Sequence, residues 1–154
     1  MALTQTEADA LIAMPKVFAD NEPLEFPETQ PMRYERPMRS TDRREEFIFD
    51  LERGRRNRAR LKYQTRARKI VVLARLDMNG PAHHNPPDSP FRPGERMECP
   101  HFHRYTEGYE DRVAYRLADV ANLVVRDVSD GVSCLEGFLR YCHVQNRPVI
   151  QRTI

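Results

Sequence analysis

The sequence has few of the features that mark a secreted, membrane-spanning or strongly charged protein. Its three cysteines are odd in number and irregularly spaced, which argues against a disulfide framework and for reduced thiols. No apolar run approaches the roughly 18 residues of a membrane span, and no secretory leader pattern is present. A formal net charge of +2 gives no strong whole-chain attraction for nucleic acid or membranes. We expect a cytoplasmic protein with no membrane contact, whose binding depends on local patches.

Length and composition suit one folded domain. A chain of 154 residues, of which 40% are hydrophobic and 31% charged, can bury a core without disulfides or metal. No internal repeat is visible. We therefore expect a single domain over residues 1–154. Its expected parts are an N-terminal helix over 1–20, a proline-rich arm over 21–45, an antiparallel sheet over 46–118 with a long loop at 77–96, and a C-terminal helix over 129–146.

Local patterns define these parts. Thr4 with Glu7 predicts a capping box for the first helix, and Ser133 with Glu136 predicts one for the second. Four prolines among polar residues favour an extended connector between the first helix and the sheet. Apolar alternation and one continuous apolar run predict about five strands, at 46–52, 58–66, 70–76, 97–105 and 113–117. The chain should be an α+β protein in which an antiparallel meander carries the C-terminal helix on one face.

The best candidate for a site is a row of polar side chains in the expected strand at 97–105. Because side chains on a strand repeat every second residue, an extended backbone would point Cys99, His101, His103 and Tyr105 the same way. One strand could thus present a thiol, two imidazoles and a phenol to a single ligand.

Three interpretations of this row stay open. In the first, zinc is bound by Cys99, His101 and His103 with His83 or His84 from the long loop, since thiolate and imidazole are suitable ligands. Neighbours on one strand face lie about 6.6 Å apart, which is wide for a metal cage, so we expect no cofactor and keep zinc as the alternative. In the second, the histidines are structural and hydrogen-bond the long loop, and the Asp77 carboxylate could orient His83 or His103.

The third interpretation is metal-independent RNA cleavage. A base removes the ribose 2′-hydroxyl proton, cations hold the phosphate, and an acid protonates the leaving oxygen. Either His101 or His103 could be the base, and arginines could form the clamp. The candidate catalytic residues are His101, His103, His83, Arg75, Arg104 and Tyr105, with Arg66 as a further clamp.

A second candidate site is the basic segment from Arg53 to Lys69, which has nine basic residues and no acidic one. Such a segment can follow a phosphate backbone. The alternative is an ordinary solvated surface, in which carboxylates of the preceding strand neutralise the basic side chains across the sheet. The candidate nucleic-acid or partner contacts are Arg55, Arg56, Arg58, Arg60, Lys62, Arg66 and Arg68.

Three stretches carry a resemblance to known sequences: Tyr63–Arg66, Arg75–Pro86 and Pro100–Tyr109, the last with the pattern PHxHxYxEGY. They resemble a family of small uncharacterised proteins of bacteria and mobile elements. More distantly, the order of an Arg-Leu-Asp strand, a histidine-bearing loop and a Pro-His-x-His strand is similar to toxins of the TumE type, from toxin and antitoxin pairs.

The similarity to toxins implies an RNA-directed, toxin-like domain, either an endoribonuclease or an RNA binder, whose partners are RNA and a cognate antitoxin. The alternative is a non-enzymatic inhibitor from a phage or mobile element that binds a bacterial defence complex. In that case the arginines and the proline-rich loop are docking surfaces and the histidines determine the fold.

Overall fold

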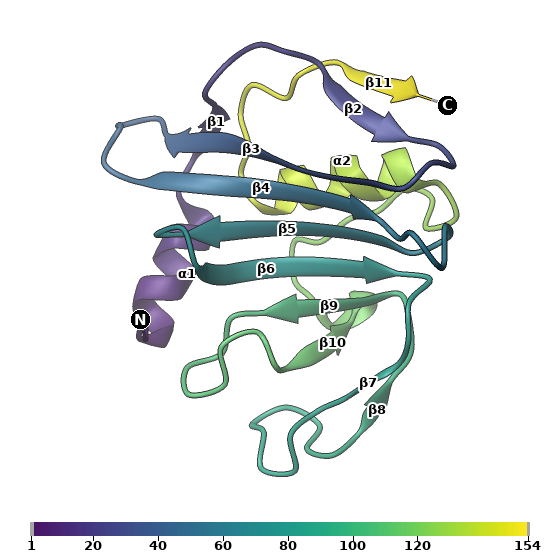
Figure 1. Cartoon of the computed structure of the whole chain (residues 1–154). Coiled ribbons are helices and arrows are strands. Elements are labelled where there is room, and N and C mark those ends of the chain that lie inside the picture. The colour runs from purple at the N-terminus through teal and green to yellow at the C-terminus, as the bar shows by residue number, and fades with distance from the viewer. Residues whose placement is uncertain (1, 154) are drawn as a thin grey trace.

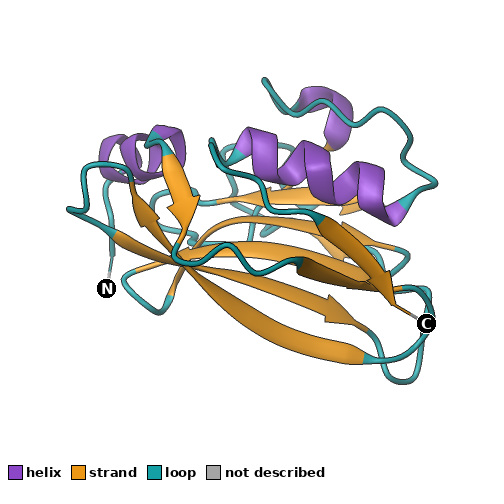
Figure 2. Cartoon of the chain, turned by 90° about the horizontal axis from the view of Figure 1, so that it is seen from above, coloured by secondary structure: helices purple, strands orange, loops and turns teal. Residues whose placement is uncertain are grey.

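The computed structural model describes residues 2–153, which form a twisted antiparallel sheet with two helices on one of its faces (Figures 1 and 2). The expected α+β class is confirmed, but the main sheet has seven strands rather than about five. In spatial order these are β1 (Lys16–Phe18), β3 (Met32–Ser40), β4 (Glu46–Arg53), β5 (Leu61–Ala67), β6 (Val71–Met78), β9 (His101–Arg104) and β10 (Ala114–Arg116).

Two small sheets and three helices complete the fold. The small sheets are a parallel pair of β2 (Leu24–Pro27) with β11 (Ile150–Thr153) and an antiparallel pair of β7 (His83–His84) with β8 (Arg96–Met97). The helices are α1 (Gln5–Ala13), the short 3-10 helix η1 (Leu117–Asp119) and α2 (Gly131–Tyr141). None of the helices within residues 2–153 is long and apolar enough to cross a membrane.

The helix starts follow local capping chemistry. The Thr4 hydroxyl accepts from the Glu7 N–H and the Glu7 carboxylate accepts from the Thr4 N–H, so the expected capping box of α1 is confirmed. The expected box of α2 is wrong. Its N-cap is Asp130, whose carboxylate accepts from the N–H of Ser133, so Ser133 already lies in the first turn. Both helices are shorter than the ranges 1–20 and 129–146.

The proline-rich stretch at 21–45 is extended, as expected, but it is paired into sheets rather than a free connector. It supplies β2, which belongs to a small separate sheet, and the nine-residue strand β3 of the main sheet. The second unexpected strand of the main sheet is β1, which lies within the range 1–20 that was expected to be helical. Pro37 is tolerated because β1 pairs only with Met38–Ser40, so the preceding part of β3 has β4 as its single neighbour. A proline at such an edge removes no ladder hydrogen bond.

The core lies between the sheet and α2. Alternate residues of β4 and β5 point inward and are buried, as their sequence pattern predicted. Phe138 of α2 sits at the centre, with its ring centroid 6.2 Å from that of Tyr63 and 6.3 Å from those of Phe49 and Phe102. One helical side chain therefore packs against three strands. All three cysteines are free, and Cys134 and Cys142 are buried in this core.

A fully buried lysine joins the ends of both helices. The Lys16 ammonium donates to the carbonyls of Ile12, Met14 and Cys142 at 2.8, 3.0 and 2.9 Å, so its three N–H donors are all satisfied. These carbonyls lie at the C-terminal ends of α1 and α2, where the helix dipole favours a cation. Burial lowers the pKa of Lys16 to about 8.

We expect Lys16→Met to lower the free energy of unfolding by about 3 kcal/mol, because it leaves two buried carbonyls and one partly buried carbonyl without this donor. Urea unfolding at pH 7 measures the change. Lys69→Met, at an exposed lysine, is the matched control and should change stability by less than about 0.5 kcal/mol. A Lys16→Met variant as stable as the control would show that the three hydrogen bonds contribute nothing net.

Candidate functional site

The candidate site is built by the pairing of two central strands. In the antiparallel register of β6 and β9, Asp77 lies opposite His101 and Arg75 lies opposite His103. Phe102, between the two histidines, points to the opposite face of the sheet and is buried against α2. The register therefore places two imidazoles, a carboxylate and a guanidinium together on the sheet face away from the helices. We call Arg75, Asp77, His101 and His103 the polar cluster.

One carboxylate oxygen is the centre of the polar cluster. Asp77 Oδ2 lies 3.2 Å from His101 Nε2 and 3.3 Å from His103 Nε2. The contact with His103 has the distance of an ion pair but lacks the alignment of a hydrogen bond, so His103 Nε2 has no hydrogen-bond partner. Both histidines are 1% exposed, and the Asp77 side chain is 11% exposed.

The remaining carboxylate oxygen is held by an arginine. Arg75 Nε lies 3.1 Å from Asp77 Oδ1, and its Nη1 lies 3.0 Å from a carboxylate oxygen of Asp111. Burial alone would raise the pKa of Asp77, but the hydrogen bond from His101, the close approach of the His103 ring and the charge of Arg75 hold that pKa well below its usual range. Burial lowers the pKa of His103, and Arg75 adds to this effect against the opposing pull of Asp77.

Backbone carbonyls hold the far side of each imidazole ring. His103 Nδ1 lies 2.8 Å from the carbonyl oxygen of Asp111, and His101 Nδ1 lies 3.2 Å from that of Glu98. A carbonyl can only accept, so His103 Nδ1 carries a proton and donates it to Asp111, and in the neutral ring His103 Nε2, which faces Asp77, carries a lone pair. The Asp77 carboxylate can also only accept, so the hydrogen bond between His101 Nε2 and Asp77 needs a proton on that nitrogen. A neutral His101 ring can therefore donate either to Glu98 or to Asp77, but not to both.

The long loop covers this face of the sheet with a third histidine. The His83 ring centroid lies 4.8 Å from that of His103 and 6.1 Å from that of His101, and His83 Nε2 lies 2.7 Å from the carbonyl oxygen of Arg112. Buried Asn85 ties the loop to β10 through both the N–H and the carbonyl of Ala114. His101 and His103 are thus enclosed beneath the loop, whereas His83 itself is partly exposed.

Three residues of the predicted row and clamp lie elsewhere. The Tyr105 hydroxyl donates to the Leu3 carbonyl and accepts from its N–H, and Arg104 pairs with Asp9 of α1 at 2.9 Å. Cys99 Sγ lies 3.6 Å from His101 Nδ1, on the side of the ring away from Asp77. Strand alternation aligns side chains only within a strand, and β9 covers residues 101–104, so Cys99 and Tyr105 lie outside it.

The polar cluster and its surroundings include two residues that were not among the predicted catalytic residues. Asp77 was considered only as an orienting group, and Asp111 was not among the candidate residues. The position of Asp77 at the end of an apolar strand was a usable signal, whereas nothing in the sequence marks Asp111.

Some arginines of the basic segment form ion pairs or hydrogen bonds within the protein, and others are exposed at the surface. Arg66 pairs with Asp50 at 2.7 Å and with Glu35 at 2.5 Å, and Arg68 pairs with Glu45 at 3.6 Å. Cross-strand neutralisation, one of the two alternatives, therefore applies to this end of β5. Arg53 is also committed, because its Nε donates to the Pro27 carbonyl at 2.7 Å.

The other arginines gather at the turn between β4 and β5, which we call the basic tip: Arg55, Arg56, Arg58 and Arg60. Arg55, Arg56 and Arg58 are exposed, and within residues 2–153 they form no ion pair. Asn57 Nδ2 donates to the Asn79 carbonyl at 2.9 Å, so the turn is anchored to the end of β6. Lys62, on β5 opposite Glu52, is half-buried.

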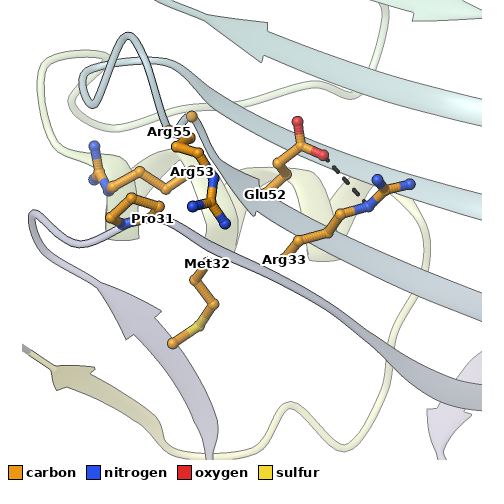
Figure 3. A pocket seen from close by; sticks show the side chains of 7 residues that line it. Pro31, Met32, Arg33, Glu52, Arg53 and Arg55 are labelled. Carbon is orange, nitrogen blue, oxygen red and sulfur yellow. Dashed lines mark ion pairs between the residues drawn. The ribbon is translucent and has the colours of Figure 1, made fainter.

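A pocket adjoins the basic tip. Figure 3 shows the side chains of Arg33, Arg53 and Arg55 around it, with Arg33 reaching Glu52 through an ion pair of 3.6 Å. Arg33 lies on β3, and its side chain is 86% exposed. The neighbouring strand thus adds a further accessible guanidinium beside the tip.

Comparison with known proteins identifies the family of this chain but not its function. The model of a family of unknown function (DUF6978) matches residues 3–144. The chain belongs to this family. No curated protein and no solved structure matches it. The DUF6978 match spans both the polar cluster and the basic tip, while the similarity to TumE-type toxins stays a prediction.

We expect Arg75→Leu to lower the free energy of unfolding by about 2 kcal/mol, because it removes the cation between the carboxylates of Asp77 and Asp111. Urea unfolding at pH 7 measures the change in stability. EDTA is present so that no bound metal ion contributes to it. Arg126→Leu, at an exposed arginine, is the matched control. Equal stability of the two variants would contradict an electrostatic role for Arg75.

Proposed function

We propose that this DUF6978 protein is an RNA-directed domain that contacts the RNA phosphate backbone through the basic tip. The observation that carries the proposal is that Arg55, Arg56 and Arg58 are exposed and uncommitted, while other arginines of the same segment are engaged in ion pairs. Guanidinium groups donate two parallel hydrogen bonds to phosphate and stay charged at every physiological pH, which suits them to this ligand.

The anchoring of the turn supports the proposal. The tip is a short connection between two paired strands. Besides the hydrogen bond from Asn57 to the Asn79 carbonyl, Asn79 Nδ2 donates to the Ala59 carbonyl at 3.0 Å, so two hydrogen bonds hold the turn. A turn that is already ordered loses less conformational entropy when its side chains bind. Phosphate contacts of this kind give affinity that depends on salt rather than on sequence.

The histidines have no direct contact with RNA in this proposal. At 1% exposure, His101 and His103 could act on a substrate only if the loop carrying His83 moved away. The toxin-like role is therefore proposed to act by binding: occupation of RNA would slow growth, and an antitoxin would relieve it by covering the basic tip.

We expect Arg55→Glu with Arg56→Glu to weaken binding of a fluorescently labelled single-stranded RNA by tenfold or more in an anisotropy titration. The alanine double variant should reduce the dependence of log Kd on log salt by about 0.7 for each phosphate that no longer meets an arginine. The matched control is Arg43→Glu with Arg44→Glu, which makes the same charge change at the exposed turn between β3 and β4, at the other end of the sheet.

Two results would overturn the proposal. One is the absence of RNA binding by the wild-type protein at low salt, and the other is an equal loss of binding in the control. If the wild-type protein binds no RNA but co-purifies with a large bacterial complex through Arg55 and Arg56, the partner of the basic tip is a protein and not RNA. Growth arrest on expression, abolished in the Arg55 and Arg56 variant and kept in the control, would support the toxin-like role.

A further inference from the structure

We propose that Asp77, His101 and His103 bind one divalent transition-metal ion. The three side chains offer one carboxylate oxygen and two imidazole nitrogens, and these atoms all lie within 4.8 Å of one another. The set differs from the cysteine-containing one that the strand pattern suggested, because the third ligand comes from β6 and not from β9. Two histidines and one carboxylate are a common ligand set for such ions.

The first argument is the direction of the lone pairs. His103 Nδ1 donates to the Asp111 carbonyl, so the neutral His103 ring aims an unprotonated Nε2 at the Asp77 carboxylate oxygen 3.3 Å away. Two electron-rich atoms then face each other within a buried space, which is repulsive without a cation between them. His101 Nε2 faces the same oxygen at 3.2 Å and completes the set of three ligand atoms. His103 Nε2 is buried and has no hydrogen-bond partner, so a metal ion would satisfy it.

The second argument is distance. Two ligand atoms held about 2.1 Å from one ion at the tetrahedral angle lie roughly 3.3–3.4 Å apart. The two nitrogen-to-oxygen distances, 3.2 and 3.3 Å, are already close to this value. The ligand nitrogens of His101 and His103 lie within 4.8 Å of each other, so this third pair of ligand atoms must approach more closely when an ion binds.

The third argument is the surrounding shell. Histidine ligands usually donate their second N–H to a carbonyl or carboxylate, which fixes the ring and makes the coordinating nitrogen more basic. Each ring has a backbone carbonyl in place for this bond, at Glu98 for His101 and at Asp111 for His103, and Arg75 holds the carboxylate oxygen that faces away from the two Nε2 atoms. The charges of Arg75, Asp77 and Asp111 sum to −1 with neutral histidines, which favours a cation.

The identity of the ligands selects the class of ion. Imidazole nitrogens favour zinc, iron, cobalt or nickel, whereas calcium and magnesium prefer shells of oxygen atoms. Because the site is enclosed by the loop carrying His83, the ion would act structurally and fasten β9 to β6 beneath that loop. The inference is independent of RNA binding, since the basic tip contains none of the three ligands.

Metal binding can be tested directly with protein purified without a histidine tag and stripped with EDTA. We expect one equivalent of Zn²⁺ to stay bound after desalting, measured by elemental analysis, and saturating Zn²⁺ to raise Tm by about 5 °C or more. Co²⁺ should give the visible absorption of nitrogen and oxygen coordination without the charge-transfer band of a thiolate. His103→Gln and Asp77→Asn should each weaken binding at least about tenfold.

Two controls locate the site. His84→Gln changes an exposed histidine next to His83, and Cys99→Ser removes the thiol of the alternative ligand set. Both should bind Zn²⁺ as the wild type does. A wild-type protein that retains less than about a fifth of an equivalent would overturn the inference, as would a thiolate band with Co²⁺ or an equal loss of affinity in either control. The wild-type measurements decide the matter even if a ligand variant fails to fold.

Discussion

The pairing register of β6 with β9 is the constraint on which the rest of the structure depends. Phe102 must face α2 to reach the core around Phe138, and this choice sends His101 and His103 to the other face. A slip of one residue would bury the imidazoles among aromatic rings and expose Phe102. The hydrophobic requirement of one side chain thus fixes the position of the polar cluster, and the packing of the core and the chemistry of the site have one common cause.

Much of the fold could be predicted from local pattern. The alternation in β4 and β5 identified their buried faces, and the continuous apolar run was identified as a strand, β6, which lies inside the sheet between β5 and β9. β3 could not be identified in this way, because Pro37 resembles a strand breaker unless the edge position of that segment is known. Whether a strand lies at the edge or at the centre is a property of the assembled sheet, and the sequence of that strand alone does not reveal it.

The candidate site, like the fold, could be predicted within single strands but not between strands. His101 and His103 were found because both lie within one strand, where period two applies. Asp77 comes from a neighbouring strand, and a sequence does not reveal which residues of two strands lie opposite one another. The arginines of the basic segment could not be sorted from the sequence for the same reason. The register of β4 and β5 brings Arg66 to Asp50, whereas Arg55 and Arg56 lie in the turn, where no residue of the neighbouring strand is opposite them.

The three hydrogen bonds of Lys16 also have a consequence for the order of folding. Its contact with the Cys142 carbonyl spans 126 positions, so α1 and β1 cannot reach their final environment until α2, which is synthesised after them, has formed. Until then the apolar face of α1, with Leu11 and Ile12, has no finished core to cover and stays accessible to chaperones.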